Sequence, residues 1–184
     1  CKVLPLGLDV RNPNGRALLD RGLLGEYVNR CGFPSFVCWL MKDTCLPPVL
    51  RFSDPALALA MGASLMTQRN RAENVSEEEF RRLVFIPFAN PFRVYELWRD
   101  VEAFESMFAH GATGYSFNSL GMWKTSEVEL SDISLHTSLT LQSAILMDRL
   151  EWRDWDLVPG AQIPAPDSVD ALLPGYTEQY DPGR

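Results

Sequence analysis

The sequence has little of the chemistry that most enzymes need. It contains two histidines, His110 and His136, and neither has a second His or Cys at a metal-ligand spacing. A G-x-S-x-G nucleophile elbow, a G-x-G-x-x-G loop and a Walker motif are all missing. These absences argue against a zinc enzyme, a serine hydrolase and a P-loop nucleotidase.

Basic clusters and long apolar runs are missing as well. The chain has 17 Lys and Arg residues against 24 Asp and Glu residues, for a net charge of −7, and its basic residues are scattered. Because clustered Lys and Arg side chains hold nucleic-acid backbones and anionic lipids, we expect no nucleic-acid partner and no binding to anionic membranes. No apolar run approaches the roughly 20 residues that a bilayer span requires. The composition therefore predicts a soluble, acidic protein without a membrane span.

The four cysteines, Cys1, Cys31, Cys38 and Cys45, are too few for a disulfide scaffold in a chain of 184 residues. Zinc knuckles pair ligands two to four residues apart, and these spacings are wider. We therefore expect reduced, buried thiols and an intracellular compartment, either the cytoplasm or an organelle matrix. Because the chain begins with Cys rather than Met, we expect either that it starts after processing or that a leader precedes the residues given, so the absence of a targeting signal excludes nothing.

The length of the chain fits one domain, and its 46% hydrophobic and 22% charged residues are ordinary for a globular protein. Residues 1–30 carry turn signals, and Pro, Gly and Asp dominate from Pro159 onward. We predict a globular domain over residues 1–158 and an extended Pro-rich arm over residues 159–184. Four large side chains of the arm could pack on its own domain or on a partner: Leu172, Leu173, Tyr176 and Tyr180.

Hydrophobic periodicity predicts the strands of a mixed α/β fold. Continuous apolar runs at residues 35–41, 49–52 and 84–88 are typical of short buried strands. Apolar and polar residues alternate over 133–141, which is typical of a strand with one buried face. Residues 146–155 resemble a further strand.

Capping signals predict the helices. A Ser-Asp-Pro start signal precedes the Ala- and Leu-rich residues 56–68, and residues 76–79 form a capping-box pattern. The Asn-Pro pair at 90–91 starts a predicted helix whose apolar stripe of Val94, Leu97, Trp98, Val101, Phe104 and Phe108 has core spacing and whose end is marked by Gly111. A short helix is also expected at residues 168–173.

Two motifs near the start of the chain resemble a known family. Residues 11–16 read RNPNGR, and residues 21–25 read RGLLG. This combination resembles the RNPxGR…RGLLG stretch of the ADP-ribose pyrophosphatase branch of the Nudix hydrolases. That branch includes a mitochondrial enzyme and the C-terminal domain of the melastatin-type cation channel that ADP-ribose gates. The resemblance implies a Nudix-like α/β/α sandwich with a mixed sheet, and it adds the mitochondrial matrix to the expected compartments.

The catalytic part of the family pattern is not intact. Nudix hydrolysis uses several carboxylates to hold divalent metal, which the family supplies from a box of the form G-x5-E-x7-R-E-x2-E-E-x-G. Counting from Gly62 leaves one acidic residue, Glu77, at an acidic box position. The other counted positions fall on Gln68, Ser76, Phe80 and Arg81. The acidic loop with an Arg that grips the ligand in this branch corresponds to residues 114–119, which have neither.

Three hypotheses about function follow. The preferred one is a catalytically degenerate Nudix-like domain that acts as a structural or regulatory subunit of a larger assembly, without a cofactor and with protein partners at its C-terminal arm. The enzyme alternative is a divergent Mg-dependent hydrolase of ADP-ribose or nucleoside diphosphates, with Glu73, Glu77 and Glu78 as metal ligands, although a helix start also favours these glutamates. The third is a module that binds ADP-ribose without cleaving it, with Arg16 and Arg21 at the phosphates.

Overall fold

The computed structural model describes residues 32–69, 76–80, 82–120 and 133–180. The chain divides into two compact units. Residues 33–67 and 83–184 form the larger unit, and residues 1–32 and 68–82 form the smaller one. The larger unit contains the main sheet and every helix of the described residues.

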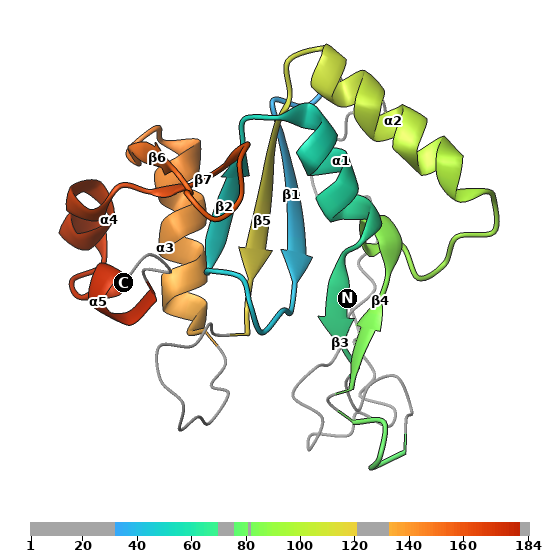
Figure 1. The fold of residues 1–184 in the computed structure, drawn as a ribbon, viewed down its shortest axis with the longest axis horizontal. Helices are drawn as coiled ribbons and strands as arrows, with labels where there is room; N and C mark the ends of the chain where they lie inside the picture. The colour runs from blue at the N-terminus through green and yellow to red at the C-terminus, as the bar shows by residue number, and fades with distance from the viewer. Residues whose placement is uncertain (1–31, 70–75, 81, 121–132, 181–184) are drawn as a thin grey trace, which may run out of the picture. The chain divides into compact units, whose positions relative to one another are not determined.

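A five-stranded mixed sheet is the centre of the larger unit (Figure 1). Its strands lie in the order β1 (Phe36–Met41), β5 (Thr113–Asn118), β2 (Val49–Phe52), β7 (Ala161–Pro164) and β6 (Trp152–Asp154). Strands β1 and β5 are parallel, whereas the pairs β5–β2, β2–β7 and β7–β6 are antiparallel. The expected mixed α/β fold is thus confirmed, and so are the two strands predicted at residues 35–41 and 49–52.

A second, two-stranded sheet pairs β3 (Met66–Gln68) with β4 (Leu83–Phe85). The strand predicted at 84–88 is therefore shorter than expected, and a 3-10 turn, η3 (Pro87–Ala89), follows it. Phe88 and Ala89 have φ values of 53° and 54° in this turn. Non-glycine residues seldom adopt such values, and backbone strain of this kind needs surrounding contacts to hold it.

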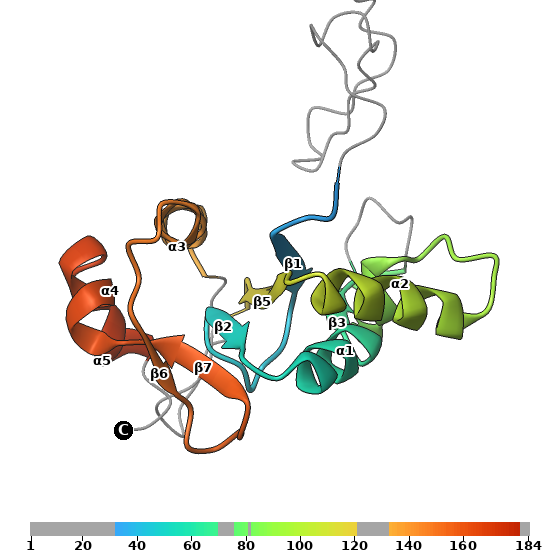
Figure 2. The same ribbon diagram turned by 90° about the horizontal axis from the view of Figure 1, so that it is seen from above.

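Helices cover both faces of the main sheet (Figure 2). Helices α1 (Pro55–Ala63) and α2 (Leu97–Ala109) lie on one side, and α3 (Leu135–Leu146) lies on the other. Helix α1 begins where its start signal predicted, because the Asp54 side chain accepts the Ala56 N–H at 2.9 Å. It ends before residue 68 because the chain turns into β3.

The helix predicted from residues 90–91 begins later, at Leu97. The Asn90 side chain accepts the Phe92 N–H at 3.2 Å. This local bond is typical of an Asx turn, which offers the backbone an alternative to the helix. Gly111, with φ 92°, follows the end of α2 as predicted.

The strand predicted over residues 133–141 was wrong, because these residues open helix α3. Ser134 is its N-cap and accepts the Thr137 N–H at 3.0 Å. Leu135 and Leu139, which the alternating pattern placed in the core, are 73% and 50% exposed. Apolar residues four apart fit a helix as well as a strand, and the cap decides between the two. Of the strand predicted at 146–155, only β6 is present.

The C-terminal segment differs from the extended arm that its proline content predicted. Strand β7 lies between β2 and β6 inside the main sheet. Helices α4 (Pro166–Leu172) and α5 (Tyr176–Tyr180) follow it. Pro164 ends β7 and Pro166 begins α4, so both prolines occupy element ends, where they are tolerated. The apolar side chains of this segment pack on the chain's own core.

Each face of the main sheet has its own apolar core. The face under α1 and α2 is built around Trp39, Phe52 and Phe108. The face under α3 is built around Tyr115 and Leu141 and includes Tyr176 of α5. None of the helices in the described ranges has the length and apolar character that crossing a membrane requires.

Candidate functional site

The predicted site residues are only partly within the described ranges. Arg16, Arg21 and Glu73 lie outside them, as do the two motifs at residues 11–25. Glu77 and Glu78 are exposed. Over the residues that are described, no three His, Cys, Asp or Glu side chains gather closely enough to hold a metal ion. The magnesium site therefore stays a prediction.

The capping pattern at residues 76–79 has a local structural role. The Glu79 N–H donates to Ser76 Oγ at 3.3 Å, and the Ser76 N–H donates to Glu79 Oε2 at 3.4 Å. These are the reciprocal bonds of a capping box. Residues 77–80 form a turn rather than the short helix that the pattern predicted.

Gly62, from which the Nudix box was counted, has a packing role in helix α1. A Cβ at this position would lie 2.7 Å from the Phe88 ring and 2.8 Å from the Trp39 ring. Only glycine allows both rings to approach the helix this closely. The position of this glycine is therefore explained by packing alone.

Residues 114–119, which the resemblance placed at a ligand loop, belong mainly to the buried strand β5. Ser116 and Asn118 are buried there. The Asn118 side chain accepts the Asp43 N–H at 2.9 Å and donates to the carbonyls of Asp43 at 2.8 Å and Leu46 at 2.6 Å. These bonds fix the loop that joins β1 to β2, so the role of Asn118 is structural.

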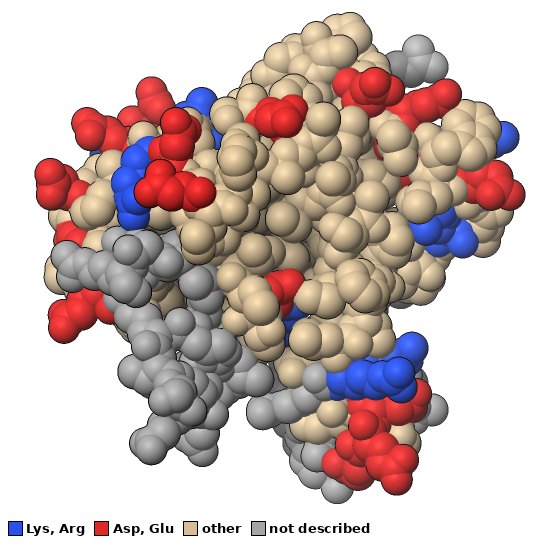
Figure 3. Space-filling model, in the orientation of Figure 1, with Lys and Arg blue, Asp and Glu red and all other residues tan. Residues whose placement is uncertain are grey.

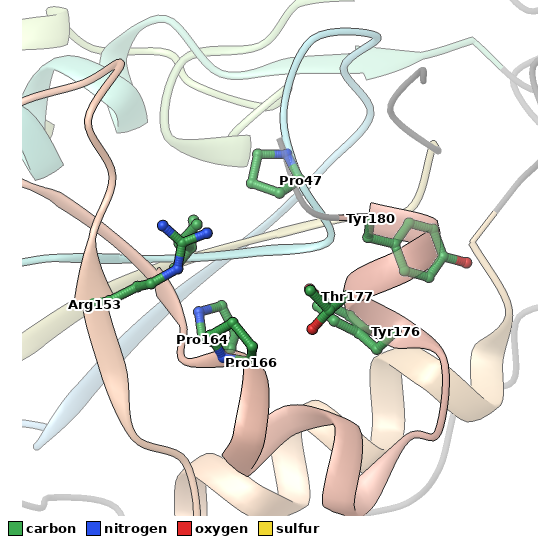
Figure 4. Close-up of a pocket in the computed structure, with 8 residues that line it drawn as sticks. Pro47, Arg153, Pro164, Pro166, Tyr176, Thr177 and Tyr180 are labelled. Atoms are coloured by element: carbon green, nitrogen blue, oxygen red, sulfur yellow. The ribbon is translucent and has the colours of Figure 1, made fainter. Parts of the chain in front are cut away.

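A small cavity lies beside α5 (Figure 4), where Arg153, Pro164, Tyr176 and Thr177 are among its lining residues. Its volume is about 10 Å³. A space of this size holds about one water molecule and no organic ligand.

The most prominent feature for binding is an exposed apolar surface just before and at the start of α2. We call it the apolar loop, and it consists of Phe92, Val94, Tyr95, Leu97 and Trp98. Phe92, Val94 and Trp98 are 81%, 95% and 52% exposed. The sequence placed Val94, Leu97 and Trp98 in the core because their spacing fits a helix face, and this prediction was wrong.

A polar network holds the apolar loop in place. The Arg93 Nε donates to Asp100 Oδ2 at 2.7 Å, and a second guanidinium nitrogen donates to the Pro87 carbonyl at 2.6 Å. The Tyr95 hydroxyl donates to Asp100 Oδ1 at 2.7 Å, and the Asn90 side chain donates to that hydroxyl at 3.2 Å. These bonds thus join the side chains of Asn90, Arg93 and Tyr95 to Asp100 in the first turn of α2 and to the Pro87 carbonyl.

Asp100 is the centre of this network and is buried. Desolvation acts to raise the pKa of Asp100. The hydrogen bonds from Arg93 and Tyr95 and the charge of Arg93 outweigh it and hold the pKa below its ordinary value. The carboxylate is therefore charged at neutral pH, and the ion pair with Arg93 persists.

Acidic side chains lie beside the apolar loop and along α2. Glu96, Glu102 and Glu105 are exposed, and acidic groups lie along α2 in Figure 3. The Arg99 guanidinium lies 5.5 Å from the centre of the Trp98 ring, within the range of a cation–π contact. The surface is thus an apolar centre with a mainly acidic rim.

Sequence reasoning missed this site because the apolar residues have helical spacing, although residues 90–96 precede the helix and are held by side-chain bonds to Asp100 and Pro87. A signal was present in the Asn-Pro pair at 90–91, which can start a turn as well as a helix.

Comparison of the chain with models of protein families finds no match, and the curated proteins include none with significant sequence similarity to it.

Proposed function

We propose that this chain is a non-hydrolysing subunit that binds another protein through the apolar loop. One observation carries the proposal: Phe92, Val94 and Trp98 are exposed to water on a segment that an ion pair and three further hydrogen bonds hold in one conformation. Contiguous exposed apolar side chains of this kind mark interaction sites on proteins.

The fixed conformation matters for binding as much as the exposed area does. Ordering a flexible loop and its side chains on binding costs free energy, and a loop that is already ordered avoids most of that cost. Trp and Phe are also well suited to the centre of an interface, because each buries a large area with few rotatable bonds.

The charge around the loop favours a protein partner with basic groups at its rim. Glu96, Glu102 and Glu105 would repel an anionic membrane, and they would repel the same rim on a second copy of the chain. A partner with an apolar groove and flanking Lys or Arg residues complements both the centre and the rim.

The subunit role is the one that the sequence suggested, but the contact site is the apolar loop instead of residues 159–184. The sequence assigned partners to residues 159–184, but Leu173 and Tyr176 pack in this chain's own core. The Nudix-like ancestry and the binding of ADP-ribose remain part of the proposal only through the motifs at residues 11–16 and 21–25. A thermal-shift measurement with ADP-ribose, with and without Mg²⁺, tests them separately.

The test compares complex size for matched variants of the full chain. Size-exclusion chromatography of native-cell extracts should show the tagged wild-type chain well above the 20.8 kDa of a single copy. The triple variant Phe92→Ser, Val94→Ser, Trp98→Ser should elute near that mass. Its melting temperature should match the wild type, because exposed side chains contribute little to folding stability.

The matched control is Leu135→Ser with Leu139→Ser, which removes two exposed leucines from α3 instead. This variant should elute with the wild type. A wild-type chain that elutes as a single copy, or a triple variant that stays in the large species, contradicts the proposal. Sedimentation of the purified chain distinguishes self-association, because a dimer lost in the triple variant would make the partner a second copy.

A further inference from the structure

A lateral row of polar side chains crosses the α3-facing side of the main sheet. The strand registers place Cys38 opposite Tyr115, Tyr115 opposite Arg51, and Arg51 opposite Gln162. Gln162 in turn lies opposite Asp154 and donates to its carboxylate at 3.0 Å. Sheet faces under a helix are usually apolar, so a polar row at this position needs an explanation.

The row lies next to an open pocket at the C-terminal end of α3. The pocket has a volume of about 200 Å³. An apolar cavity of about 150 Å³ accommodates benzene, so this one has room for a single ring or a small fused ring system. We call it the Arg51 pocket, and its lining residues are Phe36, Arg51, Thr113, Tyr115, Ile145, Leu146, Asp148, Leu150 and Trp152.

Arg51 supplies the positive charge of the pocket. Its guanidinium lies 5.9 Å from the centre of the Trp152 ring. Its Nε is buried and has no hydrogen-bond partner within the described part of the chain. A guanidinium that lines the pocket and has no hydrogen-bond partner within the described residues can pair with a ligand oxygen through its terminal nitrogens.

Aromatic rings supply the walls. The centroids of Phe36 and Tyr115 are 5.9 Å apart, and those of Tyr115 and Trp152 are 5.7 Å apart. Tyr115 is buried, whereas Phe36 is exposed and Trp152 is half-buried, so the rings extend from the floor of the pocket to its opening. Such an arrangement suits a flat ring, which can stack on or meet the edges of these side chains.

The remaining groups limit how much negative charge the pocket accepts. Asp148 lies at the exposed rim and has a φ of 52°, in the left-handed region. Burial raises the pKa of Tyr115, the charge of Arg51 opposes this change, and Cys38 and Asp148 add to it. The Tyr115 hydroxyl therefore stays neutral at physiological pH and acts as a hydrogen-bonding group rather than a charge.

From this geometry we infer that the Arg51 pocket binds a small aromatic carboxylate, with its ring against Trp152 and Phe36 and its carboxylate on Arg51. Arg51 is the one cationic side chain among the lining residues of this pocket in the described part of the chain, so it can pair with a single carboxylate. Phosphate dianions would meet Asp148 with too little positive charge to hold them. The pocket and the apolar loop belong to opposite sides of the sheet, so this inference is independent of the proposed partner.

Calorimetric titration of the full chain with three probes tests the inference. Indole-3-acetate should bind with a Kd below about 1 mM, a modest affinity that suits a ligand of this size. Indole-3-acetamide has nearly the same shape without the charge, and it should bind at least about tenfold more weakly. Phenyl phosphate should not bind detectably.

Variants then assign the binding to the pocket. Arg51→Met should weaken the binding of indole-3-acetate at least about tenfold, whereas Arg99→Met, which removes an exposed arginine from α2, should leave it unchanged. Asp148→Asn should keep or strengthen that binding and allow phenyl phosphate to bind.

Failure of indole-3-acetate to bind the wild-type chain overturns the inference, and so does equal binding of the acetamide. Undiminished binding to Arg51→Met places the ligand elsewhere and also overturns it. Thermal melting of each variant checks that it is folded, and the probe comparison on the wild type decides the matter if Arg51→Met does not fold.

Discussion

The two faces of the main sheet are built from alternate residues of the same strands, yet they differ in how completely they are covered. In β1, Trp39 and Met41 are buried under α1 and α2, whereas Phe36, Cys38 and Leu40 on the other face are exposed. The first face is closed by an aromatic cluster, and the second leaves the Arg51 pocket open where α3 ends. We infer that the interior of the closed face provides stability and that the open face has room for a small ligand.

The largest expected effect is on the closed face. Trp39 is buried and contacts the rings of Phe52, Phe88, Phe104 and Phe108. Trp39→Ala should lower the free energy of unfolding by about 3–5 kcal/mol, the usual range for removing a large aromatic side chain from a core. Urea denaturation measures it. Trp152→Ala on the open face should cost less than half as much, and equal losses would break the distinction between the faces.

A smaller effect is expected where α1 approaches the same cluster. Gly62→Ala inserts a Cβ at 2.7–2.8 Å from the Phe88 and Trp39 rings. Overpacking of this kind costs about 1–3 kcal/mol, although the better helix propensity of Ala recovers up to about 1 kcal/mol. Gly32→Ala is the matched control, since no atom lies within 4 Å of a Cβ there. A melting temperature of Gly62→Ala at or above that of the wild type would contradict the close approach.

The ion pair between Arg93 and Asp100 should make the stability of the fold depend on pH in the acid range. The pKa of Asp100 is lower in the folded chain than its ordinary value of about 3.9. The unfolded state therefore takes up a proton first, so the contribution of Asp100 is present above the ordinary value and is lost as the pH falls through the folded one. Melting temperature measured below about pH 4 should fall more steeply for the wild type than for Asp100→Asn. Parallel curves would show that the network does not stabilise the loop.

The smallest expected effect is on the open face. Arg51→Met keeps an apolar side chain of similar length and removes the charged guanidinium. The Nε of this guanidinium has no hydrogen-bond partner in the described residues. The free energy of unfolding should change by no more than about 1 kcal/mol in either direction. Denaturation curves of the two proteins measure it. A loss comparable with that of Trp39→Ala would make Arg51 a core residue and would weaken the case for a binding site.

The sequence predicted the fold where the signals are local. The apolar runs predicted β1 and β2, and the capping signal at Asp54 predicted the start of α1. Strand β5 was missed because the family resemblance placed residues 114–119 at a ligand loop, and because Gly114, Ser116 and Asn118 do not give the apolar pattern of a buried strand. These small or polar residues are buried for reasons that depend on distant contacts, such as the bonds from Asn118 to the β1–β2 loop.

The candidate sites were less predictable than the fold, and the reason differs between the two. The conformation of the apolar loop depends on the bonds from Arg93 to Asp100 and to the Pro87 carbonyl. The sequence did not indicate it, because the apolar residues of the loop have the spacing of a helix face. The Arg51 pocket depends on the register that sets Arg51 opposite Tyr115. The side chains of the Arg51 pocket come together only after strands far apart in the chain have paired, and no local pattern encodes that pairing.

The position of β7 has a consequence for synthesis on the ribosome. Residues 161–164 supply an interior strand, with β2 and β6 as its neighbours. Until the ribosome has made and released these residues, the nascent chain presents the backbone of β2 as an unpaired edge, which is prone to pairing with other chains. The residues made before β7 therefore carry an exposed strand edge, and we expect the yield in cells to depend on chaperones that shield that edge.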